Sequence, residues 1–218
     1  MPSNLDPALK IAEFLLQIKA VKLSPAKPFT WASGWKSPIY CDNRKTLSYP
    51  PVRTYIRQQF VHIINSEFGR PDMIAGVATG GIAHGALVAH DMGLPFIYVR
   101  SDAKGHGLGN QVEGDLTVGR SVVVVEDLVS TGKSSLSAVK ALRDAGCEVK
   151  GMVSIFTYGF DEAAKAFAKE KVKLFSLTNY SILLDQALRS DYITEKDLMP
   201  LNEWRKGPAS WGVGSKVQ

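Results

Sequence analysis

The chain has 218 residues, of which 45% are hydrophobic, and we expect one domain spanning residues 1–218 with a sizeable core. A formal net charge of +5 suits small anionic ligands, and the sequence has no basic run with interleaved aromatic residues, so we expect no nucleic-acid partner. No apolar run has the length of a membrane span, no signal peptide is apparent, and there are only two cysteines, which predicts a cytoplasmic protein with no membrane partner.

The first quarter of the chain predicts two helices separated by extended segments. Asp6 and Pro7 form an N-cap with proline at the first helical position, and apolar residues at helical spacing follow to about Lys19. Short extended segments are expected on both sides of Gly34, and a second helix is expected to begin near Pro51.

From residue 73 onward, strand patterns alternate with helix patterns, which predicts an α/β fold with a central parallel sheet and helices on both faces. The strands are expected near 73–77, 96–99, 121–126, 149–156 and 172–176, and the helices near 81–92, 132–145 and 161–170. Residues 180–206 predict short helical pieces, and about 207–218 a loose tail. Because ligands of such sheets bind beyond the carboxyl ends of the strands, the loops there are the candidate site.

The most informative segment covers residues 122–135. Four valines predict a strand buried on both faces, followed by two carboxylates, Glu126 and Asp127, which we expect to be exposed at the strand end. Gly132 allows a tight turn into a helix, whose first N–H groups suit a phosphate. The segment therefore predicts a site for a phosphorylated ribose. A strand, turn and helix that bind nothing is the alternative; an ATP-binding P-loop is excluded because its first glycine would fall on Asp127.

Two further loops carry candidate ligand groups. Thr79 and Gly80 lie in a glycine-rich turn between a strand and a helix, where exposed backbone suits an anion, although a turn that merely needs glycine is equally compatible. Residues 100–114 are also rich in glycine and contain Arg100, Lys104 and His106. A mobile cationic loop suits a reaction that expels an anion, because the loop can close over the site and neutralise the leaving group. The alternative is a surface loop with incidental charges.

Three segments resemble motifs of one enzyme family. Val123–Ser134 resembles the phosphoribosyl pyrophosphate (PRPP) motif of the type I phosphoribosyltransferases, which is a hydrophobic strand, two acids, two variable residues and Ser/Thr-Thr-Gly. Arg100, Lys104, His106 and Gly107 resemble the catalytic loop of the orotate phosphoribosyltransferases. The pattern Phe-Thr-x-x-Ser-Gly-x-x-Ser-Pro-x-Tyr at 29–40 is similar to an N-terminal block of the same enzymes.

The resemblance implies the type I phosphoribosyltransferase fold, with a small hood contributed mainly by about 1–48. It implies transfer of the ribose 5-phosphate of PRPP to orotate, giving orotidine 5′-monophosphate and pyrophosphate in the de novo biosynthesis of UMP. A homodimer is expected, and Mg²⁺ is expected to be held mainly through PRPP, with no metal site built by the protein alone. A purine-type phosphoribosyltransferase and a non-catalytic PRPP-sensing regulator are the alternatives.

The resemblance also implies roles for individual residues. Lys104 and Asp127 would be catalytic, and Tyr40 and Ser130 would bind orotate. PRPP would be bound by Arg100, Lys104, His106, Thr79, Gly80, Glu126, Asp127, Leu128, Val129, Ser130, Thr131, Gly132, Lys133 and Ser134.

The chain departs from the family pattern at four positions. Ala32, Ser101 and Asp102 stand where some members have lysine, and Tyr158 stands near the place of an arginine that holds the carboxylate of the base in some members.

Overall fold

The computed structural model describes residues 6–31, 34–100 and 111–211 of the chain. Its centre is a six-stranded sheet in the order β10-β9-β8-β5-β6-β7. The strands are β5 (Met73–Val77), β6 (Phe96–Val99), β7 (Val112–Glu113), β8 (Ser121–Val129), β9 (Glu148–Thr157) and β10 (Leu174–Asn179). All neighbours are parallel except β6 and β7. The predicted sheet is therefore confirmed, with a short antiparallel edge strand that the sequence pattern did not indicate.

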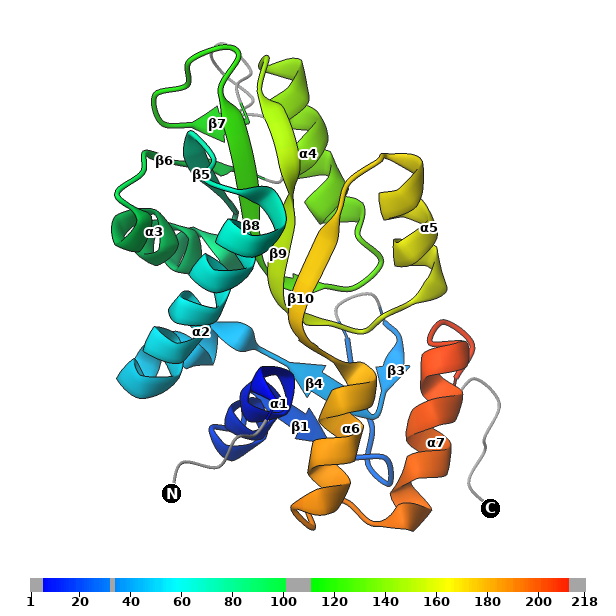
Figure 1. Cartoon of the computed structure of the whole chain (residues 1–218). Coiled ribbons are helices and arrows are strands. Elements are labelled where there is room, and N and C mark those ends of the chain that lie inside the picture. The colour runs from blue at the N-terminus through cyan, green and yellow to red at the C-terminus, as the bar shows by residue number, and fades with distance from the viewer. Residues whose placement is uncertain (1–5, 32–33, 101–110, 212–218) are drawn as a thin grey trace.

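Helices cover both faces of the sheet, as predicted (Figure 1). One face packs against α2 (Pro50–Ile63) and α3 (Gly80–Met92), and the other against α4 (Lys133–Asp144) and α5 (Asp161–Lys169). The valines of β8 explain this, because successive side chains of a strand point to opposite faces. Val123 and Val125 enter the core on the α2 and α3 side, and Val122 and Val124 enter the core on the other side.

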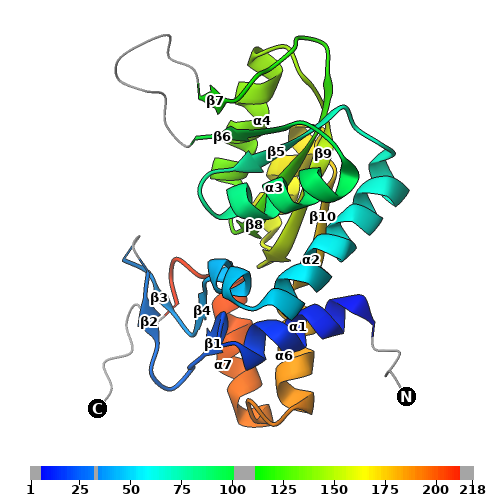
Figure 2. The same ribbon diagram turned by 90° about the vertical axis from the view of Figure 1, so that its left-hand side faces the viewer.

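A second layer of structure lies at the carboxyl end of β8 (Figures 1 and 2). It contains α1 (Pro7–Gln17), the hairpin-like pairs β1 (Val21–Leu23) with β4 (Ile39–Cys41) and β2 (Phe29–Thr30) with β3 (Lys36–Ser37), and the 3₁₀ helix η1 (Asn43–Ser48). The helices α6 (Tyr180–Arg189) and α7 (Glu195–Lys206) join these N-terminal elements, and a π-helical turn, η2 (Ile64–Phe68), extends α2. Trp211, in the predicted tail, packs against the main core.

Buried aromatic rings connect α7 to the N-terminal strands. Trp204 of α7 is fully buried, with its ring centroid 5.6 Å from that of Trp31 and 5.5 Å from that of Tyr158. Such edge-to-face contacts bury much apolar area and add directional preference. The C-terminal helices thereby support the layer that covers the end of β8.

Candidate active site

Two adjoining cavities lie at the carboxyl end of β8. The first, here called the acidic cavity, has a volume of about 370 Å³ and is lined by Cys41, Asp42, Arg44, Ala78, Thr79, Gly80, Glu126, Asp127, Leu128 and Ser134. The second, here called the aromatic cavity, has a volume of about 330 Å³ and is lined by Thr30, Trp31, Tyr40, Cys41, Leu128, Ser130 and Tyr158. Cys41 and Leu128 border both, so a ligand in one cavity lies next to a ligand in the other.

The two carboxylates do not end the strand, which corrects the prediction from sequence. β8 continues to Val129 because Leu128 and Val129 still pair with Phe156 and Thr157 of β9. Side-chain alternation therefore sends Glu126 toward α4 and Asp127 toward α3. The expectation of two exposed acids is wrong for Glu126, which is only 4% exposed.

Buried hydrogen bonds hold Glu126 in place. Its Oε2 accepts a hydrogen bond from the hydroxyl of Ser135 at 3.1 Å, and its Oε1 accepts one from the backbone N–H of Asp127 at 3.0 Å. Burial raises the pKa of Glu126 well above its usual value, and the neighbouring charge of Asp127 raises it further. Burial also raises the pKa of Asp127, against the opposing effects of its interaction with Glu126 and of the Arg44 charge.

The predicted turn around Thr79 and Gly80 lies directly beside Asp127 in the acidic cavity. A Cβ placed on Gly80 would overlap the Asp127 carboxyl, and a Cβ on Gly81 would overlap the carbonyl oxygen of Val125. Only glycine at both positions lets the start of α3 approach β8 so closely. The peptide bond between Ala78 and Thr79 is cis.

The residues from 128 to 134, all predicted to contact PRPP, line different cavities. Leu128 and Ser134 line the acidic cavity and Ser130 the aromatic one, whereas Val129 is buried in the strand. Gly132 adopts a left-handed conformation with φ of 82°, which turns the chain into α4. Lys133 is exposed and forms an ion pair with Glu162 at 3.8 Å.

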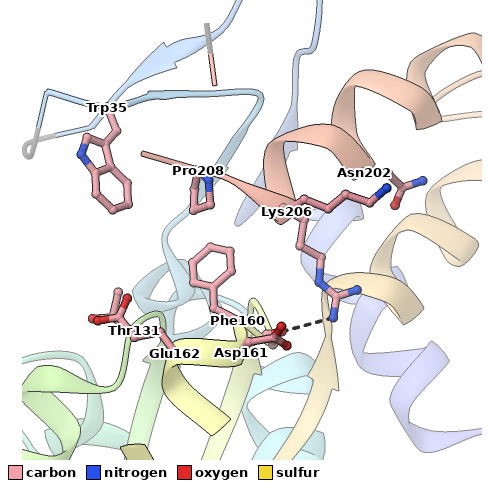
Figure 3. A pocket seen from close by; sticks show the side chains of 10 residues that line it. Trp35, Thr131, Phe160, Asp161, Glu162, Asn202, Lys206 and Pro208 are labelled. Atoms are coloured by element: carbon pink, nitrogen blue, oxygen red, sulfur yellow. Dashed lines mark hydrogen bonds between the residues drawn. The ribbon is translucent and has the colours of Figure 1, made fainter. Parts of the chain in front are cut away.

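Thr131 lines a third cavity of about 590 Å³ between the start of α5 and the end of α7. Figure 3 shows Trp35 and Thr131 on one side of it and Asn202 and Lys206 on the other. Arg205 and Gly159 also line this cavity, and the guanidinium of Arg205 donates a hydrogen bond to the carbonyl oxygen of Gly159 at 3.2 Å.

The three cations of the predicted catalytic loop are only partly described. Lys104 and His106 lie outside the described residues. Arg100 pairs with Glu113 at 3.4 Å, and its backbone N–H donates to the carbonyl of Gln111 at 2.9 Å. It thus lies at the β6–β7 edge of the sheet and lines neither the acidic nor the aromatic cavity as described.

Tyr40 and Ser130, predicted from different parts of the sequence, both line the aromatic cavity. Tyr158, for which the sequence pattern predicts no role, is a further lining residue. Its ring is 2% exposed and stacks on Phe160 with centroids 5.4 Å apart, while burial raises the pKa of its hydroxyl well above the usual value. The hydroxyl has no hydrogen bond within the part of the chain that the structure describes. It is therefore a protonated donor available to a ligand.

Sequence comparison agrees with this geometry. The family model of the phosphoribosyl transferase domain matches residues 51–185, more than half of the chain. The chain therefore belongs to the phosphoribosyltransferase family. Within it, the chain is similar to two curated orotate phosphoribosyltransferases. It is 61% identical to that of Bacteroides fragilis over 93% of this chain and 96% of the relative. It is 54% identical to that of Listeria innocua over 93% and 97%.

Solved structures support the same assignment of family and fold. The orotate phosphoribosyltransferase of Aeropyrum pernix superposes with a TM-score of 0.74 at 29% identity, covering 84% of this chain and 99% of that one. The UMP synthase of Leishmania donovani superposes with a TM-score of 0.76 at 28% identity, covering 91% of this chain and 42% of the larger protein. The resemblance and the fold inferred from sequence are both confirmed. Among the described residues, no helix is long and apolar enough to cross a membrane.

Proposed function

We propose that the chain transfers the ribose 5-phosphate of PRPP to orotate, yielding orotidine 5′-monophosphate and pyrophosphate in the biosynthesis of UMP. High identity to orotate phosphoribosyltransferases over nearly their whole length supports this function. The observation that carries it in the structure is the contact between an acidic and an aromatic cavity at one strand end. A sugar phosphate in the first would present its anomeric carbon to a base in the second.

Charge explains what the acidic cavity would contribute. Breaking the bond between ribose and pyrophosphate leaves an electron-deficient sugar and an increasingly anionic leaving group. Asp127, beside Thr79 and Gly80, would face the ribose and stabilise its developing positive charge, while Glu126 would hold a ribose hydroxyl. The first N–H groups of α4, reached through Ser130–Ser134, would bind the 5′-phosphate.

The aromatic cavity would hold the orotate ring. Tyr40 and Ser130 line it and would contact the base, as the family resemblance implies. The raised pKa of Tyr158 keeps its hydroxyl protonated, so Tyr158 would donate a hydrogen bond to an anionic or carbonyl oxygen of the base.

The remaining contacts of PRPP are proposed from the family resemblance and from charge. Lys104, together with Arg100 and His106, would neutralise the leaving pyrophosphate. Mg²⁺ would enter with PRPP as a hard cation and would be held mainly by the oxygens of that substrate. The enzyme would act as a homodimer, with small-molecule substrates and without nucleic-acid or membrane partners. The two unpaired thiols, Cys41 and Cys147, fit the reducing cytoplasm.

Substrate turnover tests the proposal. Purified enzyme with PRPP and Mg²⁺ is expected to consume orotate and release pyrophosphate in equal amounts. The kcat/KM for adenine, guanine and hypoxanthine is expected to be at least about 1,000-fold lower than that for orotate. Preferred consumption of a purine would establish the purine-type alternative. Binding of PRPP without turnover of any base would establish a PRPP-sensing regulator.

A further inference from the structure

The carbonyl oxygen of Asp127 needs a partner that the sheet does not supply. On its β5 side, β8 pairs only as far as Val125, because β5 ends at Val77. Beyond that point the side-chain amide of Asn43 replaces the missing strand: its Nδ2 donates a hydrogen bond to the Asp127 carbonyl oxygen at 2.6 Å. Asn43 is 1% exposed, so this contact is shielded from water.

Asn43 itself accepts two hydrogen bonds. Its Oδ1 accepts a hydrogen bond from the thiol of Cys41 at 3.3 Å, and its backbone carbonyl accepts one from the hydroxyl of Thr46 at 2.5 Å. The Nε2 of His84 lies 3.0 Å from the same Thr46 oxygen. Because the Thr46 proton is donated to Asn43, His84 must donate its Nε2 proton to Thr46.

His84 donates this hydrogen bond as a neutral ring. It is 1% exposed, and burial lowers its pKa to about 4, so the ring carries a single proton at neutral pH. Its Nδ1 is buried without a hydrogen-bond partner among the described residues. Protonation of Nδ1 would leave a charged N–H unpaired in the core, which costs more than an unpaired acceptor, so the neutral ring is favoured.

We propose that Asn43 is a positioning residue that sets the orientation of Asp127 for catalysis, and that Thr46 and His84 fix the position of Asn43 relative to α3. This inference rests on the proposed function. The hydrogen bonds of Asn43 connect the two cavities. Cys41 borders both cavities and donates to Asn43, and Asn43 donates to the main chain of Asp127. The same α3 that carries His84 begins at Gly80, against the Asp127 carboxyl.

Three substitutions test the role of Asn43. Asn43→Leu keeps the branched shape and the number of side-chain heavy atoms but removes the donor. Its kcat is expected to fall about ten- to a hundredfold while KM for orotate stays within about twofold. Asn43→Asp can donate only when the introduced carboxyl is protonated. Asn179→Leu is the matched control, since Asn179 accepts the capping hydrogen bond of α6 at 3.1 Å and lines neither cavity; it should lower the thermal midpoint and leave kcat unchanged.

The pH profile of Asn43→Asp separates positioning from packing. The introduced carboxyl would contact the thiol of Cys41 and the main chain of Asp127. The ion pair of Asp42 with Arg44 is adjacent in the chain, and His84 is reached through Thr46. Its kcat, divided by the wild-type kcat at each pH, is expected to be highest near pH 6 and to fall as the pH rises and the donor proton is lost. The same ratio for Asn43→Leu should be flat.

Ratios are taken with whichever base the wild-type enzyme uses, so failure to use orotate would refute the proposed function without deciding the role of Asn43. Wild-type kcat in folded Asn43→Leu, or a flat ratio for Asn43→Asp, would overturn the positioning role. If Asn43→Leu does not fold, Thr46→Val replaces it, with an expected loss in kcat of about threefold or more; unchanged kcat would again overturn the inference.

Discussion

The Cα of Gly80 lies against the carboxyl group of Asp127, at the point where α3 begins and β8 passes the end of β5. This contact leaves no space for a side chain at position 80. It fixes the distance between the turn that precedes α3 and the carboxylate assigned to the ribose, and it makes the geometry of the acidic cavity sensitive to a single methyl group.

Gly80→Ala is expected to lower kcat/KM for PRPP about a hundredfold, since the added methyl must displace the Asp127 carboxyl by about 1 Å. Steady-state kinetics measure this. Gly93→Ala is the control at the other end of α3: a Cβ there meets open space, but the φ of 60° strains any non-glycine residue. It should reduce stability and spare kcat/KM. Equal kinetic losses in both variants would contradict the prediction.

Asp127→Asn is expected to lower kcat by a hundredfold or more, on the order of 3 kcal/mol, while the free energy of unfolding stays equal or rises. The substitution removes a partly buried charge whose pKa is raised by desolvation, so the variant loses catalytic rate without losing stability. Asp72→Asn is the control, and it should lower the free energy of unfolding and leave kcat unchanged. Hydrogen bonds from Ser121 lower the pKa of Asp72, and Asp72 lies at the other end of the sheet. A folded Asp127→Asn enzyme with near-wild-type kcat would remove Asp127 from the mechanism.

The buried carboxyl of Glu126 predicts the pH dependence of stability. Its pKa is raised in the folded state, so between the unfolded value of about 4.3 and that raised value the folded protein binds more protons. The contribution of Glu126 to the free energy of unfolding therefore falls as the pH rises through this window. Urea unfolding of the wild type and Glu126→Gln, at one protein concentration, should show the wild type losing stability relative to the variant from pH 5 to pH 8. A constant difference would mean that Glu126 does not titrate in this way.

Tyr158→Phe is expected to lower kcat/KM for orotate about ten- to a hundredfold, because it removes one donor from the aromatic cavity at a cost of roughly 1–3 kcal/mol. Tyr180→Phe is a control within the same aromatic cluster, as its hydroxyl donates to the Leu201 carbonyl at 2.9 Å and serves the structure. That variant should lose stability and retain kcat/KM. Orotate kinetics unaffected by Tyr158→Phe would assign base recognition to Tyr40 and Ser130 alone.

Lys104→Ala is expected to lower kcat about a hundredfold, with a much smaller effect on PRPP binding, since charge on the pyrophosphate grows as the bond breaks. In a homodimer whose loop reaches the neighbouring site, mixing this variant with Asp127→Asn regenerates intact sites. Random exchange makes half of the dimers mixed, each with one of two sites intact, so activity should recover to about a quarter of wild type. No recovery after verified exchange would place Lys104 and Asp127 of one chain in the same site.

The parts of this protein that were predicted well depend on local sequence. The bounds of β5 and β6 were predicted to the residue, because runs of apolar residues between glycine- or proline-containing turns specify short buried strands. Glu126, Asp127 and Gly132 were recognised because their spacing in the chain is itself the motif. For the same reason, the family and its reaction followed from three short segments.

The features that were missed depend on partners distant in the chain. β8 runs three residues past its predicted end because β9 is there to pair with it, and this pairing buries Glu126. The hydrogen bond from Asn43 to Asp127 joins residues 84 positions apart. Tyr158 lines the aromatic cavity and packs against Trp204 of α7, which is distant from it in the chain.

The sequence by itself determined which reactive side chains this protein has and which strands they follow. Propensity, side-chain alternation and turn chemistry act over a few residues, so local sequence is enough to specify them. Only the tertiary structure decided which of those groups are buried, protonated or free to donate. Those properties arise from loss of water and from contacts between segments far apart in the chain, and no local pattern encodes them.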